Sequence, residues 1–131
     1  MDELSITTKA KIEFIDITKK LELFVANTGT KQGLLFCYLP HTTAALIINE
    51  SYDPSVAADI QAILTKLVPQ HTNYKHLEGN SQAHILSSLL GTQVIAPIEN
   101  GKLGLGSWQG VFFVELDGPR ERKIKLKIIK G

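Results

Sequence analysis

Side chains able to do chemistry are concentrated in three short segments of the chain, residues 40–43, 76–84 and 105–109. Together these segments hold three of the four histidines and the only tryptophan. The middle segment reads His-Leu-Glu-Gly-Asn-Ser-Gln-Ala-His and leads directly into an apolar helical pattern. Imidazoles move protons or bind metals near neutral pH, and amides and carboxylates add hydrogen bonds or ligands. We therefore expect these segments to contribute to a functional site.

The segment from His76 to His84 predicts the start of a helix, with Asn80 or Ser81 as its cap. Asn80 and His84 are four residues apart, so their side chains can share one face of that helix. Free backbone N–H groups at a helix N-terminus favour an anion such as phosphate or carboxylate. Two interpretations stay open: an anion site with a histidine donor, or a capped helix with a partly exposed histidine.

A metal site is a second hypothesis for the histidines. His41 follows a proline at a predicted strand end, and His76 lies eight residues before His84, a separation that fits no short zinc motif. A three-histidine site therefore requires the fold to bring His41 to the other two. Glu50, at the end of the next predicted strand, can act as a base or ligand, or simply mark where the sheet reaches water.

Trp108 and Gln109 begin a predicted strand and can offer a stacking surface and an amide to a flat heterocycle, although a single tryptophan also serves packing. Arg120 flanks a tight turn, where it can fork onto phosphate or stay exposed without a ligand. Cys37 lies in an apolar strand, where a buried thiol is inert, and His71 is expected at the surface.

Hydrophobic periods predict the elements that position these residues. The chain is expected to form strands at 4–15, 33–39, 44–50, 93–98, 109–116 and 122–129, and helices that begin near residues 16–18, 53 and 80 and end near residues 28, 67 and 90. The first two apolar strands after the opening helix are expected in the centre of a sheet. The lysine-rich final strand is expected at an edge, joined to its predecessor by a hairpin turn at 117–119.

This order of elements predicts a single α+β domain over residues 1–131, with a mixed or antiparallel, sandwich-like sheet of six or more strands and about three helices. Lysine and arginine number 14 against 13 acidic residues, so no broad field favours nucleic acid. No apolar run approaches the roughly 20 residues that a membrane-spanning helix needs. One cysteine and an N-terminus without a signal-peptide pattern lead us to expect a cytoplasmic protein.

Four ordered blocks, residues 41–50, 76–84, 105–109 and 117–120, resemble the signature segments of the YjbQ-like family, whose members are often labelled secondary thiamine-phosphate synthases. The resemblance covers nearly the whole chain, although Ser107 stands where the family more often has threonine. It implies a compact α+β fold, a homotrimer, and a cleft that gathers His41, His76 and His84, with a divalent metal such as zinc as an expected ligand.

The activity implied by the resemblance joins hydroxymethylpyrimidine diphosphate to hydroxyethylthiazole phosphate with release of diphosphate. Catalysis requires cationic or N–H donors at the leaving group, usually with Mg²⁺, although the chain has no dense carboxylate cluster to bind that ion. The expected catalytic residues are His41, His84, Glu50 and Arg120. The residues expected to hold the small phosphorylated or anionic molecule are Asn80, Ser81, Trp108 and Gln109.

Two alternatives to this transferase remain. In a metal-dependent hydrolase, His41, His76 and His84 would hold one metal with an open position, and Glu50 or Glu78 would be the base. In a non-catalytic binding protein, the clefts of a trimer would hold a metal or small anion without turnover.

Overall fold

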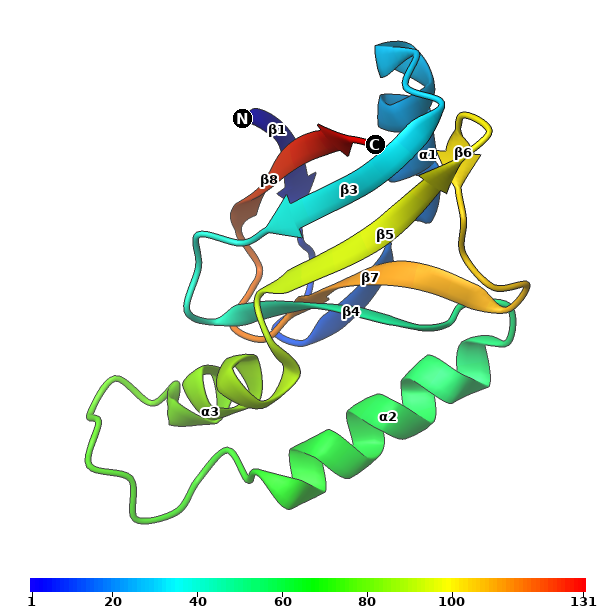
Figure 1. Ribbon diagram of the computed structural model, residues 1–131. Coiled ribbons are helices and arrows are strands. Elements are labelled where there is room, and N and C mark those ends of the chain that lie inside the picture. The colour runs from blue at the N-terminus through cyan, green and yellow to red at the C-terminus, as the bar shows by residue number, and fades with distance from the viewer.

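Two antiparallel sheets packed face to face form the framework of the protein (Figure 1). This computed structural model describes residues 1–131. A five-stranded sheet has the order β1-β8-β3-β5-β6, and a three-stranded sheet has the order β2-β7-β4. The strands are β1 (Asp2–Thr7), β2 (Glu13–Asp16), β3 (Gln32–Tyr38), β4 (Ala44–Glu50), β5 (Gln93–Glu99), β6 (Lys102–Leu103), β7 (Gln109–Glu115) and β8 (Glu121–Lys130). The helices are α1 (Thr18–Thr28), α2 (Pro54–Leu67) and α3 (Ser81–Leu90). The predicted α+β, sandwich-like fold is confirmed.

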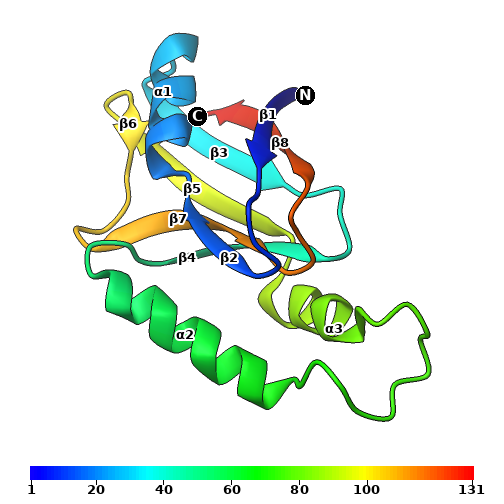
Figure 2. The same cartoon turned by 180° about the vertical axis from the view of Figure 1, so that it is seen from behind.

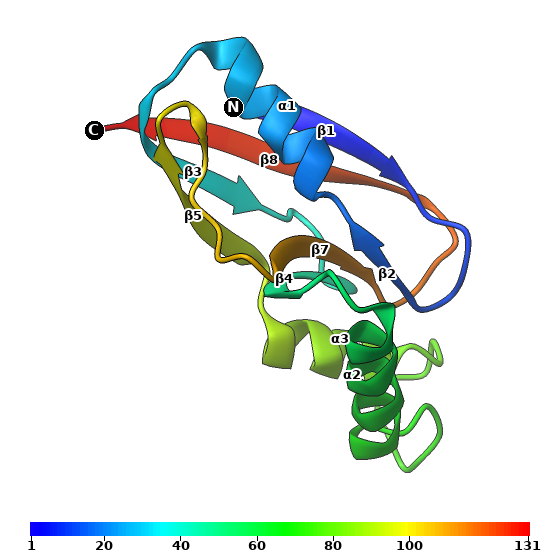
Figure 3. The same cartoon turned by 90° about the vertical axis from the view of Figure 1, so that its right-hand side faces the viewer.

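The three-stranded sheet is the middle layer of the molecule. Its inner face packs on the five-stranded sheet, where Leu46 and Phe113 belong to the same buried cluster as Leu35. Its outer face is covered by α2 and α3 (Figures 2 and 3), and Phe112 there shares a second buried cluster with Leu86 of α3. Burial on both faces explains why β4 and β7 are almost continuously apolar.

Local signals in the sequence set the start of α2 and the end of α1 as predicted, whereas no side chain caps the start of α3. The Asp53 carboxylate accepts a hydrogen bond of 2.9 Å from the Ser55 N–H at the start of α2. Gly29 adopts a left-handed φ of 70° and ends α1. Not every apolar residue of the helices faces the core, because Leu23 of α1 and Leu89 of α3 are exposed. None of the three helices combines the length and apolar character that crossing a bilayer requires.

Two predictions are wrong where the chain crosses between the sheets: the single strand at residues 4–15 and the hairpin at residues 117–119. Residues 4–15 form two strands, because the chain leaves the five-stranded sheet after β1 and enters the three-stranded sheet as β2. Residues 117–119 join no hairpin, since β7 and β8 belong to different sheets. The two crossings lie side by side, and the Gly118 N–H donates to the Lys11 carbonyl at 3.0 Å. The turn residues are those of a hairpin, but the pairing partners of each strand are distant in sequence.

Two strand positions also differ from the prediction. β4 lies at the edge of the three-stranded sheet, and its burial comes from contact with α3 rather than from a second neighbouring strand. β8 lies between β1 and β3, so its lysines do not protect an edge. Lys123 and Lys127 instead keep the outer face of the five-stranded sheet in water while Ile124 and Leu126 are buried.

A buried ion pair ties the two sheets together at the crossings. The guanidinium of Arg122, on β8, binds the carboxylate of Glu115, on β7, and both side chains are almost fully buried. Thr8 donates a hydroxyl hydrogen bond of 2.8 Å to that carboxylate, and Arg122 also donates to the Thr43 carbonyl at 3.0 Å. Burial opposes the charge on Glu115, but hydrogen bonds from Arg122, the Asp117 N–H and Thr8 outweigh it and lower the pKa of the carboxyl.

Replacing Arg122 by methionine tests this role. The change leaves the Glu115 carboxylate buried without its cation, so we expect the free energy of unfolding to fall by about 3–5 kcal/mol. Urea denaturation followed by circular dichroism measures the loss. The matched control is Lys127→Met on the exposed face of the same strand, which should change stability by less than about 0.5 kcal/mol. Similar losses in the two variants would contradict the role given to the pair.

Candidate functional site

The candidate residues lie at the two ends of β4 rather than in one place. His41 precedes the strand and Glu50 is its last residue, so seven residues separate two groups by about 20 Å. We call them the histidine end, which comprises His41, His76, Asn80, Ser81, His84 and Arg120, and the tryptophan end, which comprises Glu50, Trp108 and Gln109. One chain therefore does not bring all the predicted site residues into a single cleft.

His41 is held by the backbone of β8. The paired register of β3 and β8 stops at Tyr38 and Lys125, and its continuation would set Pro40, which has no N–H, opposite Lys123. The His41 ring takes over this position: Nε2 lies 3.0 Å from the Lys123 nitrogen and 3.1 Å from its carbonyl oxygen. One ring nitrogen is thus committed to the fold.

The surroundings of His41 favour its neutral form. Burial lowers the pKa of the imidazole, and the nearby charge of Arg122 lowers it further, against a smaller opposing effect of the Lys123 backbone. At neutral pH, His41 is therefore an uncharged imidazole with one nitrogen left for a ligand.

His84 is the residue that connects the other two histidines. Its ring centroid is 5.4 Å from that of His76, with the ring planes at 88°. His84 and His76 line a cavity of about 310 Å³ together with Ser81. His84 also lines a second cavity of about 350 Å³ that it shares with His41, Ser87, Ser88 and Thr92, and no hydrophobic side chain borders this one.

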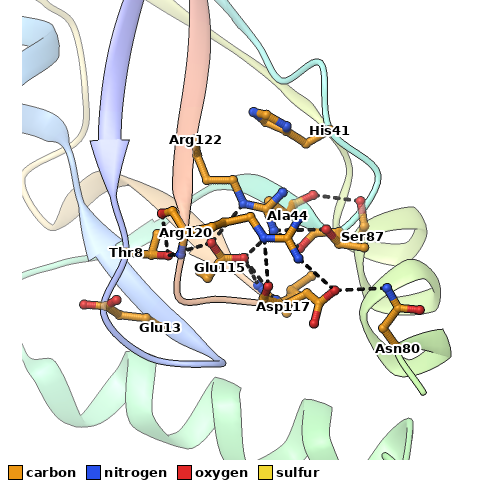
Figure 4. Close-up of polar contacts among 12 residues, drawn as sticks. Thr8, Glu13, His41, Ala44, Asn80, Ser87, Glu115, Asp117, Arg120 and Arg122 are labelled. Atoms are coloured by element: carbon orange, nitrogen blue, oxygen red, sulfur yellow. Dashed lines mark hydrogen bonds and ion pairs between the residues drawn. The ribbon is translucent and has the colours of Figure 1, made fainter. Parts of the chain in front are cut away.

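Asp117 organises the rest of the histidine end (Figure 4). Its carboxylate accepts hydrogen bonds from the Asn80 amide at 3.0 Å and from the Arg120 guanidinium at 3.2 Å. The Asn80 side chain therefore faces Asp117 and does not cap α3. Its amide oxygen is buried without a partner. Arg120 remains half exposed, so part of its guanidinium is free to meet an anion.

The chain contains no group of three or more His, Cys, Asp or Glu side chains placed to hold a metal ion. The rings of His76 and His84 are adjacent. His41 borders the cavity of about 350 Å³ instead, and its Nε2 accepts a hydrogen bond from the Lys123 N–H. The carboxylate of Asp117 is already engaged by Asn80 and Arg120. These residues do not fit a zinc or magnesium centre built from one chain.

At the tryptophan end, backbone pairing sets Glu50 opposite Gln109. The Gln109 amide oxygen accepts a hydrogen bond of 2.8 Å from the Gly106 N–H. This bond holds the loop before β7, so the amide oxygen is already occupied. Trp108 packs edge to face against Tyr52, a residue that the sequence analysis did not single out. A cavity of about 430 Å³ is lined here by Glu50, Tyr52, Asp53, Pro54 and Trp108.

The two residues set aside in the sequence analysis lie where expected. Cys37 is buried between the sheets, and its burial raises the pKa of the thiol to about 12, so it is protonated and inert. His71 is exposed in the long loop before α3. Neither contributes to the histidine end or the tryptophan end.

These features define a single-domain α+β sandwich with two small cavities, lined in part by histidines, beside α3. The chain belongs to the YjbQ family, described as UPF0047 protein YjbQ-like, whose model matches residues 2–131. UPF0047 protein MJ1081 of Methanocaldococcus jannaschii is 48% identical over 95% of this chain and 90% of that protein. UPF0047 protein YugU of Bacillus subtilis is 42% identical over 96% of both.

Solved structures show the same fold. A YjbQ/UPF0047 family protein from Clostridium acetobutylicum superposes with a TM-score of 0.95 at 48% identity, over 98% of this chain and 100% of that one. A YbjQ-like protein of unknown function from Sulfolobus solfataricus gives 0.94 at 34% identity, over 99% and 96%. The predicted family is confirmed, and the names of these relatives assign no activity.

The depressed pKa of His41 can be measured directly. We expect its ring resonances, followed by NMR as pH is lowered, to titrate below the value of about 6.5 found for an unperturbed histidine. A His41→Gln variant identifies the resonances by their loss. An ordinary titration midpoint for His41 would show that burial and Arg122 do not act on the ring as described.

Proposed function

We propose that the histidine end binds the phosphate of a small molecule and catalyses a group transfer of the thiamine-phosphate synthase type. One observation carries the proposal: His41 and His84 border the same cavity, and no hydrophobic residue lines it. The other side chains around this cavity are those of Thr42, Ser87, Ser88 and Thr92. Six hydrogen-bonding side chains around one small cavity suit a ligand rich in oxygen atoms rather than an apolar one.

The two histidines have different tasks in this proposal. His41 is neutral and fixed by Lys123, so it orients the ligand through its remaining ring nitrogen. His84 has no hydrogen bond to its ring and stands between two cavities, so it donates a proton to the diphosphate oxygen as the bond to carbon breaks. This cavity runs along the second half of α3, from His84 to Gly91, so its ligand contacts come from side chains. Ser81, in the first turn of α3, borders the other cavity, which His84 shares with His76.

Arg120 supports the leaving group. Loss of diphosphate builds negative charge, and a half-exposed guanidinium held in place by Asp117 can meet that charge without first being ordered. Magnesium bound to a diphosphate substrate would neutralise part of the same charge.

The metal-dependent hydrolase has weaker support. His76 and His84 form the only adjacent histidine pair, and Glu78 lies 3.7 Å from the His76 ring nitrogen. A third ligand would have to come from another copy of the chain, because His41 is held away by Lys123.

We also propose that the protein assembles as the homotrimer that the family resemblance implies. Helix α2 buries none of its residues, although it is amphipathic. Its side chains Ile63 and Leu67 are 62% and 67% exposed, and Leu89 of α3 is exposed on the same helical layer. Large apolar side chains left exposed on an amphipathic helix are typical of a protein interface.

Synthesis of thiamine phosphate from the two heterocyclic substrates tests the transferase. We expect His84→Ala to lower kcat about 10²–10⁴-fold, because it removes the proton-transferring group. Arg120→Ala should also lower the rate, since it removes charge at the leaving group. His71→Ala, in the exposed loop, is the matched control and should keep the wild-type rate, measured by chromatography of the product. Unchanged rates in His84→Ala and Arg120→Ala would show that the activity does not arise at this site.

Analytical ultracentrifugation tests the assembly. The wild-type protein should sediment with three times the mass of one chain, and the double variant Ile63→Asp, Leu67→Asp should shift toward one chain mass because buried aspartates would be uncompensated. Ala62→Asp adds one aspartate about 100° around α2 from Ile63 and should leave the mass unchanged. A single-chain mass for the wild type at high concentration would rule out the homotrimer.

A further inference from the structure

An aromatic pair at the tryptophan end is exposed and has no part in either buried cluster. Tyr52 and Trp108 are 75% and 57% exposed. Their ring centroids are 4.9 Å apart, and the ring planes meet at 70°. The two rings form the walls of a corner. The ring faces that line this corner are not covered by other side chains, although aromatic residues usually bury their faces.

The backbone holds this corner in place. The Ser51 N–H donates to the Trp108 carbonyl at 2.9 Å, which extends the β4–β7 pairing to the residues that carry the rings. Gly110 allows the close approach, since a Cβ there would lie 2.5 Å from Ser51 Cβ and 2.9 Å from Thr18 Oγ1. The corner is thus built on paired strands and is already formed without a ligand.

Negative charge surrounds the aromatic pair. Glu50 and Asp53 line the same cavity of about 430 Å³, and neither carboxylate takes part in an ion pair. Hydrogen bonds from the Ser55 N–H and hydroxyl lower the pKa of Asp53, which keeps it ionised. No lysine or arginine borders the cavity.

We propose that this cavity binds a small organic cation, such as a quaternary ammonium group. The faces of tryptophan and tyrosine rings carry negative potential and attract a weakly hydrated cation. Glu50 and Asp53 add charge attraction from the rim, and the same charges repel phosphate. The expected anion contact of Trp108 is therefore replaced by a cation contact. This inference concerns a different ligand from the proposed function and a site about 20 Å from the histidines.

The chemistry separates an organic cation from a metal ion. A strongly hydrated divalent ion prefers several oxygen ligands and gains little from ring faces. Here one of the two carboxylates already accepts the hydrogen bonds that begin α2. The aromatic corner contributes only if the ligand is a cation with an apolar surface.

Intrinsic fluorescence tests the proposal, because Trp108 is the only tryptophan in the chain. Choline is the probe, and 3,3-dimethylbutan-1-ol, which has the same shape without the charge, is its control. We expect a saturable change with choline and an apparent affinity at least about 10-fold weaker for the alcohol. Magnesium chloride at equal ionic strength should produce no saturable change. Absence of saturation with choline, or equal affinities of choline and the alcohol, would overturn the proposal.

Variants assign the effect to the cavity. Tyr52→Ala should weaken choline binding about 3–10-fold through loss of one ring face, and Glu50→Gln about fivefold through loss of one charge. Tyr38→Ala and Glu22→Gln remove an exposed tyrosine and glutamate elsewhere and should leave the affinity unchanged. If circular dichroism shows that Tyr52→Ala is unfolded, Tyr52→Leu is used in its place. Wild-type affinity in both cavity variants would place the choline elsewhere and refute the site.

Discussion

The ion pair between Glu115 and Arg122 is the interaction on which the arrangement of the histidine end depends. It lies where the chain passes twice between the sheets, and its partners Thr8 and Thr43 fix the ends of two further strands. Lys123, which holds His41, directly follows Arg122, and Asp117, which holds Arg120, comes two residues after Glu115. A buried charge tolerates few alternative positions, because any displacement leaves it without compensation. The positions of His41 and Arg120 at the histidine end therefore depend on the ion pair between Glu115 and Arg122.

Much of the secondary structure could be predicted because the signals are local. The Asp53 cap, the left-handed Gly29 and the alternation along β8 each act within a few residues. The sheet assignments could not be predicted in this way, since an Asp-Gly-Pro turn suits a hairpin and a crossing between sheets equally well. Which strands pair is decided by contacts between residues about a hundred positions apart, such as Thr8 with Glu115.

The candidate site was predictable in parts. The approach of His41 to His84 depends on where α3 packs against β4, which no spacing in the sequence reveals. The separation of His41 from Glu50, in contrast, follows from the predicted strand between them, because an extended strand keeps its two ends apart. Glu115 and Arg122 also left a signal, because an unpaired charge would be too costly at either position. Glu115 ends the almost continuously apolar β7, and Arg122 occupies an inward position in the alternation along β8.

The contact between His41 and Lys123 has a consequence for which molecules the protein can hold. A ligand that claimed both nitrogens of the imidazole would have to release Lys123 and leave a main-chain group unpaired where the β3–β8 ladder ends. Such a ligand would bind at the expense of strand order, and its occupancy would be coupled to fraying and to amide hydrogen exchange at that end of β8. Ligands that bind only the other ring nitrogen avoid this coupling. The contact with Lys123 therefore favours molecules that need a single nitrogen of His41.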